Sequence, residues 1–128
     1  MKIWLNRFLE EETRLLKMKS KKVLVTGGTG FIGSHTVVEL QNSGYEVVII
    51  DNLSNSEEHI VDRIEKITGK RPVFYNADCT CAESLNKIFR EHPDILATVH
   101  FAAYKAVAES IQKPLEYYRN NVYSMVEL

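Results

Sequence analysis

Glycine residues that could hold a phosphate group follow the first apolar, β-branched run of the chain. Positions 27–33 read Gly-Gly-Thr-Gly-Phe-Ile-Gly, which fits two frames: G-x-G-x-x-G beginning at Gly28 and G-x-x-G-x-x-G beginning at Gly27. In both frames an early glycine permits a turn with positive φ, and Gly30 lets the backbone approach a pyrophosphate. Gly33 lets the next helix pack close to the strand, and the N-terminus of that helix presents free N–H groups to the anion.

A carboxylate stands where a dinucleotide site needs one. Asp51 ends the second apolar run, 18 residues after Gly33. A carboxylate about 20 residues beyond the glycine loop is placed to accept hydrogen bonds from the adenosine ribose and to repel a 2′-phosphate. No arginine follows it directly, so the sequence favours NAD over NADP. The alternative is that Asp51 caps a turn or a helix.

Alternating apolar and amphipathic segments predict the elements that position these residues. The expected strands are 22–26, 46–50, 72–76 and 95–101, and the expected helices are 31–43, 57–68, 82–91 and 114–128. Ile60, Ile64 and Ile67 are expected to share the buried face of the second helix. Strands joined by helices predict a Rossmann-type, doubly wound α/β parallel sheet, incomplete at about four strands in the order 3-2-1-4. The ligand is then expected over the carboxyl ends of strands one, two and four.

Further candidate residues lie at the ends of the third and fourth strands. Asp78 and Cys79 follow strand three, where they could meet an adenine, although Cys79 fits a small buried thiol nearly as well. Small residues after the fourth strand let the backbone approach a cofactor. Lys105 could reach a ribose or a phosphate, although a lone lysine is usually just solvated. His100 is interpreted as a core or strand-end residue rather than a catalyst.

Bulk composition is that of a globular protein with one domain. Of the 128 residues 45% are hydrophobic and 26% charged, and the net charge of −1 gives no indication of nucleic-acid or membrane-surface binding. The two cysteines, Cys79 and Cys81, are too few for a disulfide framework or a zinc site and predict reduced thiols in a cytoplasmic protein. No apolar run is long enough to span a bilayer, and no metal site is expected.

Residues 1–20 differ from the rest of the chain. Trp4, Leu5, Phe8, Leu9, Leu15 and Leu16 have roughly helical spacing, but three consecutive glutamates at 10–12 argue against a signal or transit peptide. The segment is either an amphipathic docking helix or a leader appended to the domain. We favour the leader, because Met18 offers a plausible start. The cofactor domain is then 21–128.

Four strings point to one family. They are Val-Leu-Val-Thr-Gly-Gly-Thr-Gly-Phe-Ile-Gly-Ser-His (23–35), Asp-Asn-Leu-Ser-Asn-Ser (51–56), His-Phe-Ala-Ala-Tyr-Lys-Ala-Val (100–107) and Glu-Ser-Ile-Gln-Lys-Pro-Leu-Glu-Tyr-Tyr-Arg-Asn-Asn-Val (109–122). On these strings the chain resembles, over about residues 21–122, the N-terminal part of the nucleotide-sugar 4-epimerases of the extended short-chain dehydrogenase/reductase family. With the glycine loop, the residues then expected to contact NAD are Gly27, Gly30, Phe31, Ile32, Gly33, Asp51, Asn52, Leu53, Ser54, Asn55, Ser56, Asp78, Cys79, Phe101, Ala102, Ala103, Lys105 and Asn120.

The resemblance implies an oxidation and a re-reduction at C4 of a UDP-sugar, with tightly held NAD as the hydride carrier. The family's base is a tyrosine in a Tyr-x-x-x-Lys motif, and no tyrosine of this sequence has a lysine four positions later. No catalytic residue is therefore assigned, and the catalytic segment and UDP-sugar domain are expected beyond residue 128. Residues 123–125 read Tyr-Ser-Met where the family usually has Gly-Thr, and Ala103 and Ala108 stand where glycine is common. A truncated, frameshifted or fragmentary gene fits these departures.

The expected function is that of the cofactor half of such an epimerase, which binds NAD weakly and is inactive alone. The alternatives are a non-catalytic NAD-binding or interaction module and a piece of another nucleotide-sugar epimerase or dehydratase. A UDP-sugar is expected as a partner only of a full-length form, for which the resemblance implies a homodimer. The apolar run 95–99 would form an open sheet edge, so self-association is expected.

Overall fold

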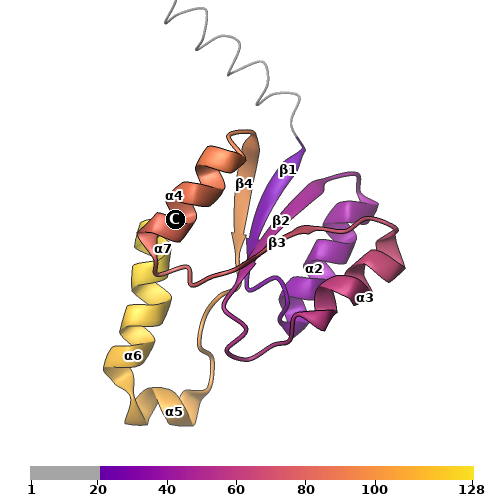
Figure 1. Cartoon of the computed structure of the whole chain (residues 1–128). Coiled ribbons are helices and arrows are strands. Elements are labelled where there is room, and N and C mark those ends of the chain that lie inside the picture. Colours follow the sequence, from indigo (N-terminus) through magenta and orange to yellow (C-terminus); the bar gives the residue numbers. More distant parts are fainter. Residues whose placement is uncertain (1–20) are drawn as a thin grey trace, which may run out of the picture.

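One parallel sheet organises the chain. The structure, a computed structural model, describes residues 21–128, so the leader expected at 1–20 lies outside the described residues. The strands are β1 (Lys22–Thr26), β2 (Glu46–Asp51), β3 (Val73–Asn76) and β4 (Ile95–His100). All pairs are parallel and the order is β3-β2-β1-β4 (Figure 1). The predicted Rossmann-type sheet is confirmed.

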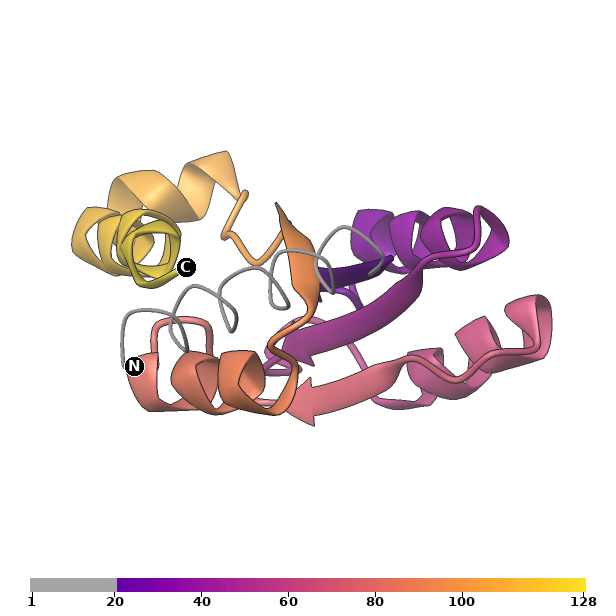
Figure 2. The ribbon, with the colours of Figure 1, turned by 90° about the horizontal axis from the view of Figure 1, so that it is seen from above.

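Helices cover both faces of this sheet. They are α2 (Phe31–Asn42), α3 (His59–Thr68), α4 (Ala82–Glu91), α5 (Val107–Gln112), α6 (Pro114–Tyr118) and α7 (Ser124–Glu127), with a π-helical turn η1 (Arg119–Tyr123) joining α6 to α7. Helices α2 and α3 lie on one face. Helix α4 and the C-terminal arm, which we define as residues 107–128, lie on the other (Figure 2).

The central strands are apolar on both sides because both faces are covered. Val23 and Val25 of β1 pack with Val37 of α2 and Ile64 of α3. Leu24, between the two valines, points the other way and packs with residues of β2 and α4. Alternate residues of one strand thus build two separate cores, the pattern expected of a buried parallel strand.

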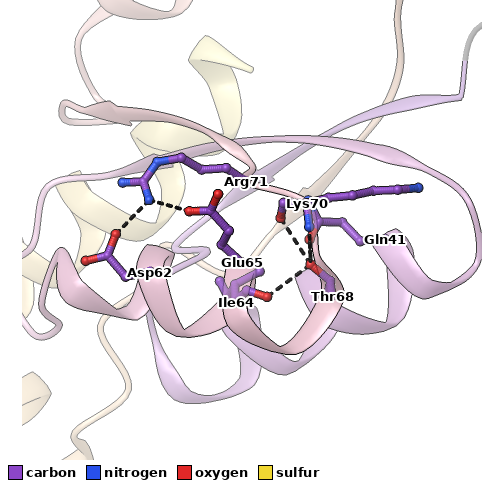
Figure 3. Close-up of polar contacts among 7 residues, drawn as sticks. All are labelled: Gln41, Asp62, Ile64, Glu65, Thr68, Lys70 and Arg71. Carbon is purple, nitrogen blue, oxygen red and sulfur yellow. Dashed lines mark hydrogen bonds and ion pairs between the residues drawn. The ribbon is translucent and has the colours of Figure 1, made fainter.

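Polar contacts tie the end of α3 to α2 and to the approach to β3 (Figure 3). The Thr68 Oγ lies 2.8 Å from Oε1 of the buried Gln41 and 3.0 Å from the Ile64 carbonyl oxygen. The Arg71 guanidinium donates to Asp62 at 2.6 Å and to Glu65 at 2.8 Å. These contacts fix the loop between α3 and β3, which aligns β3 beside β2.

The structure corrects the sequence interpretation of α3. Ile60 is half-buried and Ile64 buried, but Ile67 is exposed, and Val61, which was not predicted to be buried, is buried. Ile67 lies in the last turn, and the helix ends at Gly69, which has φ 72°. The helix begins at His59 rather than at residue 57, and β3 begins at Val73 rather than at residue 72.

The arm also differs from expectation. A helix from residue 114 was predicted and is present, but α5 was not predicted. Helix α5 is six residues long and contains no buried residue; its two apolar residues at helical spacing, Val107 and Ile111, are too few to indicate a helix. Strand β4 is an edge strand, as predicted, and its residues from Leu96 to Thr98 are exposed. No helix within residues 21–128 has the length and apolar character needed to cross a membrane.

Two isoleucines of α3 give a matched test of this packing. Ile64 is 2% exposed and Ile67 67%. Ile64→Ala is expected to lower the free energy of unfolding by about 2–5 kcal/mol through the cavity it leaves. Ile67→Ala is expected to change it by less than about 0.5 kcal/mol. Urea denaturation followed by circular dichroism measures both, and equal losses would contradict the packing described for α3.

Candidate functional site

A cleft of about 720 Å³ opens at the carboxyl ends of β1, β2 and β4. The glycine loop after β1 and the segment after β2 form one side, and the segment after β4 and the arm form the other. Figure 1 shows these segments below the sheet, where the strands end. This edge is where open α/β sheets bind ligands.

At two positions of the glycine loop, a Cβ would collide with the backbone. Gly27 has φ 66°, and a Cβ there would lie 2.8 Å from the Ala102 backbone nitrogen. A Cβ on Gly33 would lie 2.1 Å from the Gly27 carbonyl oxygen. Helix α2 therefore begins in direct contact with the turn, as the sequence predicted for Gly33. Of the two glycine frames, the positive φ belongs to Gly27, whereas Gly28 packs against the Ile49 side chain.

Helix α2 directs its N-terminus at the cleft. Phe31, Ile32 and Gly33 are its first residues and line the cleft. Their N–H groups have no carbonyl oxygen one turn back within the helix to receive them. The Gly30 N–H donates to the Gly27 carbonyl oxygen at 3.1 Å, and the Ser34 N–H closes the first turn onto Gly30 at 2.9 Å. The first turn can therefore donate hydrogen bonds to an anion in the cleft.

The Asp51 carboxylate ties the glycine loop to the segment after β2. Its Oδ2 accepts from the Thr29 N–H at 3.2 Å. Its Oδ1 accepts from the Leu53 N–H at 3.0 Å and from the Ser56 hydroxyl at 3.2 Å. The hydroxyls of Ser56 and Thr29 are also 2.8 Å apart. The capping role considered from the sequence is therefore present, and the carboxylate lines the cleft as well.

Polar and thiol groups from the loop after β3 border the same part of the cleft. Asp78 accepts from the Thr80 N–H and hydroxyl, both at 2.7 Å, and from the Asn52 amide at 3.2 Å. Burial acts to raise the pKa of Asp78, but these hydrogen bonds outweigh it and hold the pKa below its ordinary value. Burial raises the pKa of the Cys79 thiol to about 12, so the thiol is protonated at neutral pH.

Paired asparagines of η1 hold the segment after β4. The Asn121 side chain accepts from the Tyr104 N–H at 2.8 Å and donates to the Tyr104 carbonyl oxygen at 2.9 Å. The Asn120 amide donates to Asn121 Oδ1 at 2.9 Å and lines the cleft. The segment that carries Lys105 is thus fixed by the arm.

The far wall of the cleft was not predicted. It is formed by residues of the arm, among them Glu109, Lys113, Glu116 and Tyr117. Tyr117 donates to Glu109 at 2.9 Å, and Lys113 does so at 3.3 Å. These two hydrogen bonds lower the pKa of Glu109. Two sequence signals could have found this cluster: the i,i+4 spacing of Glu109 and Lys113, and its place in the run 109–122.

Nearly all predicted site residues come together in this cleft. The residues that line it are Gly27, Gly30, Phe31, Ile32, Gly33, Asp51, Asn52, Ser54, Asn55, Ser56, Asp78, Cys79, Phe101, Ala102, Ala103, Lys105 and Asn120. Leu53 is the exception, because it turns with φ 57° and its backbone N–H faces Asp51 instead. The lining also includes Ala77, Tyr104 and Ala106, of which Tyr104 and Ala106 lie within the run 100–107 singled out from the sequence. No cluster of His, Cys, Asp or Glu within residues 21–128 is arranged to hold a metal ion.

Known proteins share this sequence and fold. A sequence model of the NAD dependent epimerase/dehydratase family matches residues 23–128. The chain is 54% identical over 100 residues to a UDP-glucose 4-epimerase of Bacillus subtilis, covering 78% of this chain and 29% of the relative. It is 56% identical over 100 residues to a UDP-glucose 4-epimerase of Haemophilus influenzae, with the same coverage of both chains. The chain thus spans less than a third of the length of these relatives.

Solved structures agree. The UDP-glucose-4-epimerase of Stenotrophomonas maltophila, crystallised with NAD and formylated UDP-arabinopyranose, superposes with a TM-score of 0.81 at 47% identity. The enzyme of Bifidobacterium longum, in complex with NAD⁺ and UDP, gives the same TM-score and identity. Each comparison covers 84% of this chain and 32% of the solved chain.

The close approach at Gly33 can be tested by adding one methyl group. Gly33→Ala is expected to destabilise the fold by about 1–3 kcal/mol or more, because the new Cβ meets a backbone oxygen that cannot move aside. Gly30→Ala is the control, since its Cβ would lie 3.3 Å from that same oxygen and Gly30 has φ −68°. That change is expected to cost less than about 1 kcal/mol. Thermal unfolding measures both, and an undisturbed Gly33→Ala would contradict the described contact.

Proposed function

This chain belongs to the NAD dependent epimerase/dehydratase family, and we propose that residues 21–128 are the NAD-binding part of a UDP-glucose 4-epimerase. The observation that carries the proposal is the joint position of the α2 N-terminus, Asp51 and Lys105 around one cleft. Related crystal structures support it, since two of them hold NAD together with UDP or a UDP-sugar.

The residues present fit a pyrophosphate. The turn at Gly27 and the contact at Gly33 leave a cradle that a Cβ would fill. The N–H groups of Phe31 and Ile32 face that cradle without an intrahelical partner. We infer that they bind the pyrophosphate of NAD, with Lys105 donating from the opposite wall to a phosphate or ribose oxygen.

The carboxylate side of the cleft fits an adenosine. Asp51 Oδ1 already accepts from the Leu53 N–H and the Ser56 hydroxyl, but Oδ2 accepts only from the Thr29 N–H, so a ribose hydroxyl can donate to Oδ2. A 2′-phosphate would bring two negative groups together, which selects NAD over NADP. We propose that Asp78 and Cys79, with Asn52, border the adenine.

Bound NAD would supply a hydride acceptor and donor for a sugar carbon. The residues of this chain would hold and orient that cofactor. A base that takes the sugar hydroxyl proton is expected as Tyr-x-x-x-Lys, a spacing that no tyrosine of this sequence has. We therefore propose that the 128-residue chain binds NAD without epimerising a UDP-sugar, and that activity on UDP-glucose and UDP-galactose needs further sequence.

Titration calorimetry of the 128-residue chain with NAD and NADP tests this assignment. NAD is expected to bind at least about tenfold more tightly than NADP. Lys105→Ala is expected to weaken NAD binding about tenfold through the loss of a charged donor. Lys70→Ala, which changes an exposed lysine beyond α3, should leave binding unchanged.

The same preparations, saturated with NAD, are then incubated with UDP-galactose. No UDP-glucose is expected. Absence of NAD binding would overturn the proposed cofactor site, and turnover would overturn the proposed division between cofactor binding and catalysis.

We also propose that the isolated chain self-associates through β4. Within residues 21–128 no strand pairs with one side of β4, and Leu96 on this strand is 54% exposed. Light scattering at increasing concentration is expected to show dimers or larger species. Leu96→Lys should reduce them, because a charge on an edge strand opposes pairing, whereas Ile67→Lys on α3 should not. A monomer at all concentrations would refute this proposal.

A further inference from the structure

A hydrogen-bonded chain of three side chains lies beneath the cleft and joins three elements. Thr26 ends β1, His100 ends β4 and Ser124 begins α7. Thr26 Oγ1 is 2.7 Å from His100 Nδ1, and Ser124 Oγ is 3.3 Å from His100 Nε2. Thr26 and Ser124 are fully buried, while His100 is half-buried. Neither the proposed NAD contacts nor the core packing requires this arrangement.

The surrounding donors settle which way each proton points. Thr26 Oγ1 accepts from the Ala102 N–H at 3.2 Å and from the Phe101 N–H at 3.1 Å, a donor that it shares with the Thr26 carbonyl oxygen at 3.0 Å. With these two N–H groups donating to it, the Thr26 hydroxyl has its own proton to give. The 2.7 Å distance favours His100 Nδ1 as the acceptor over the Cys79 sulfur, which also contacts Thr26. The neutral imidazole must then carry its proton on Nε2, which donates to Ser124 Oγ. Thr26, His100 and Ser124 thus form a directed relay from β1 to α7.

The relay holds both parts of one cleft wall. At its Thr26 end it binds the N–H groups of Phe101 and Ala102, which line the cleft. At its Ser124 end it anchors the helical run that carries Tyr117 and Asn120, which line the cleft from the arm. A shift of α7 would therefore move the wall that faces the glycine loop.

We propose that Thr26, His100 and Ser124 are positioning residues that fix the C-terminal arm against the sheet, and that protonation of His100 releases the arm and weakens cofactor binding. The part of this proposal that concerns the cofactor rests on the proposed NAD site. The positioning of the arm does not.

Protonation would break the relay at its Thr26 end. A proton on Nδ1 would face a hydroxyl oxygen whose two lone pairs are already occupied by backbone N–H groups. Burial also lowers the pKa of His100 from its ordinary value of 6.5. When the arm is detached from the sheet, His100 is no longer buried and binds a proton more readily. The contribution of His100 to holding the arm is therefore complete above about pH 6.5, and it is lost as pH falls from there toward the lowered pKa.

Two titratable groups near Thr26, Cys79 and Asp78, do not change charge in that interval. The Cys79 thiol, which contacts Thr26 from the loop after β3, has a pKa raised to about 12 by burial. Asp78, which acts on that thiol, has a lowered pKa and stays ionised, and Asp51 also acts on it. A change between pH 7 and 5.5 at this place therefore reports His100.

Nuclear magnetic resonance of the 128-residue chain tests the relay without any ligand. The nitrogen shifts of His100 are expected to show a protonated Nε2 and an unprotonated Nδ1, with a pKa below 6.5. Amide hydrogen exchange across residues 119–128, corrected for intrinsic rates, is expected to quicken as pH falls from 7 to 5.5. A proton on Nδ1 in the neutral ring, or a pKa at or above 6.5, would overturn the proposal.

Two variants separate the relay from general destabilisation. Ser124→Ala should speed exchange in residues 119–128 about fivefold at pH 7, and His100→Asn, which cannot titrate, should abolish the pH dependence. Ser43→Ala and His59→Asn, at exposed positions on the opposite face, are the controls and should behave as the unmodified chain. Unchanged exchange in Ser124→Ala, or a persistent pH dependence in His100→Asn, would overturn the proposal.

Cofactor binding supplies the last readout. In the unmodified chain, NAD affinity is expected to decrease as pH is lowered from 7 to 5.5. In Ser124→Ala, NAD affinity is expected to be about fivefold weaker at pH 7. If NAD affinity is unaffected by Ser124→Ala while exchange responds, the arm is positioned but the link to the cofactor is wrong. If the chain binds no NAD at any pH, the proposed function and the cofactor link fail together, and the exchange data still decide the relay.

Discussion

The close approach of α2 to the turn that precedes it is the constraint on which the site depends. A Cβ at Gly33 would fall 2.1 Å from the Gly27 carbonyl oxygen, so no other residue type fits without moving the backbone. Because the helix starts there, its first residues line the cleft at the end of β1. The side chains of Val37 and, from α3, Ile64 then reach the sheet. One steric condition therefore sets both the anion-binding geometry and the packing of the helical layer.

The two faces of the sheet have different roles. On one face, α2 and α3 bury an apolar core and carry few groups of the cleft apart from the start of α2. On the other face, α4 packs on the core, and the arm reaches past the sheet to form a cleft wall (Figures 1 and 2). The arm is joined to the rest by the packing of Leu128 against the core beside α4 and by polar contacts, such as those of Asn121 with Tyr104 and of Ser124 with His100. The polar contacts fix the position of this cleft wall but bury little apolar area.

How far the sequence predicted this structure depends on the range of each interaction. Strand β1 and helix α4 begin and end where periodicity and composition place them, because their residues are determined by local pattern. The cleft side built from the glycine loop and Asp51 was also predicted, since strand order brings the two together. Ile67 was misplaced because helical spacing alone cannot tell where a helix leaves the core. The contact of Tyr117 with Glu109 and the clamp of Asn121 on Tyr104 join separate segments of a weakly periodic region, so no local pattern signals them.

The carboxylate of Asp51 shows why such a cleft can be ready before a ligand arrives. An isolated carboxylate at 8% exposure would be costly, but the Thr29 and Leu53 N–H groups and the Ser56 hydroxyl all donate to it. The same bonds hold the glycine loop and the segment after β2 at a fixed separation. A ribose that donated to Asp51 would add to this set and would not need to replace any member. Less ordering is then left for the binding step, which is the physical meaning of preorganisation.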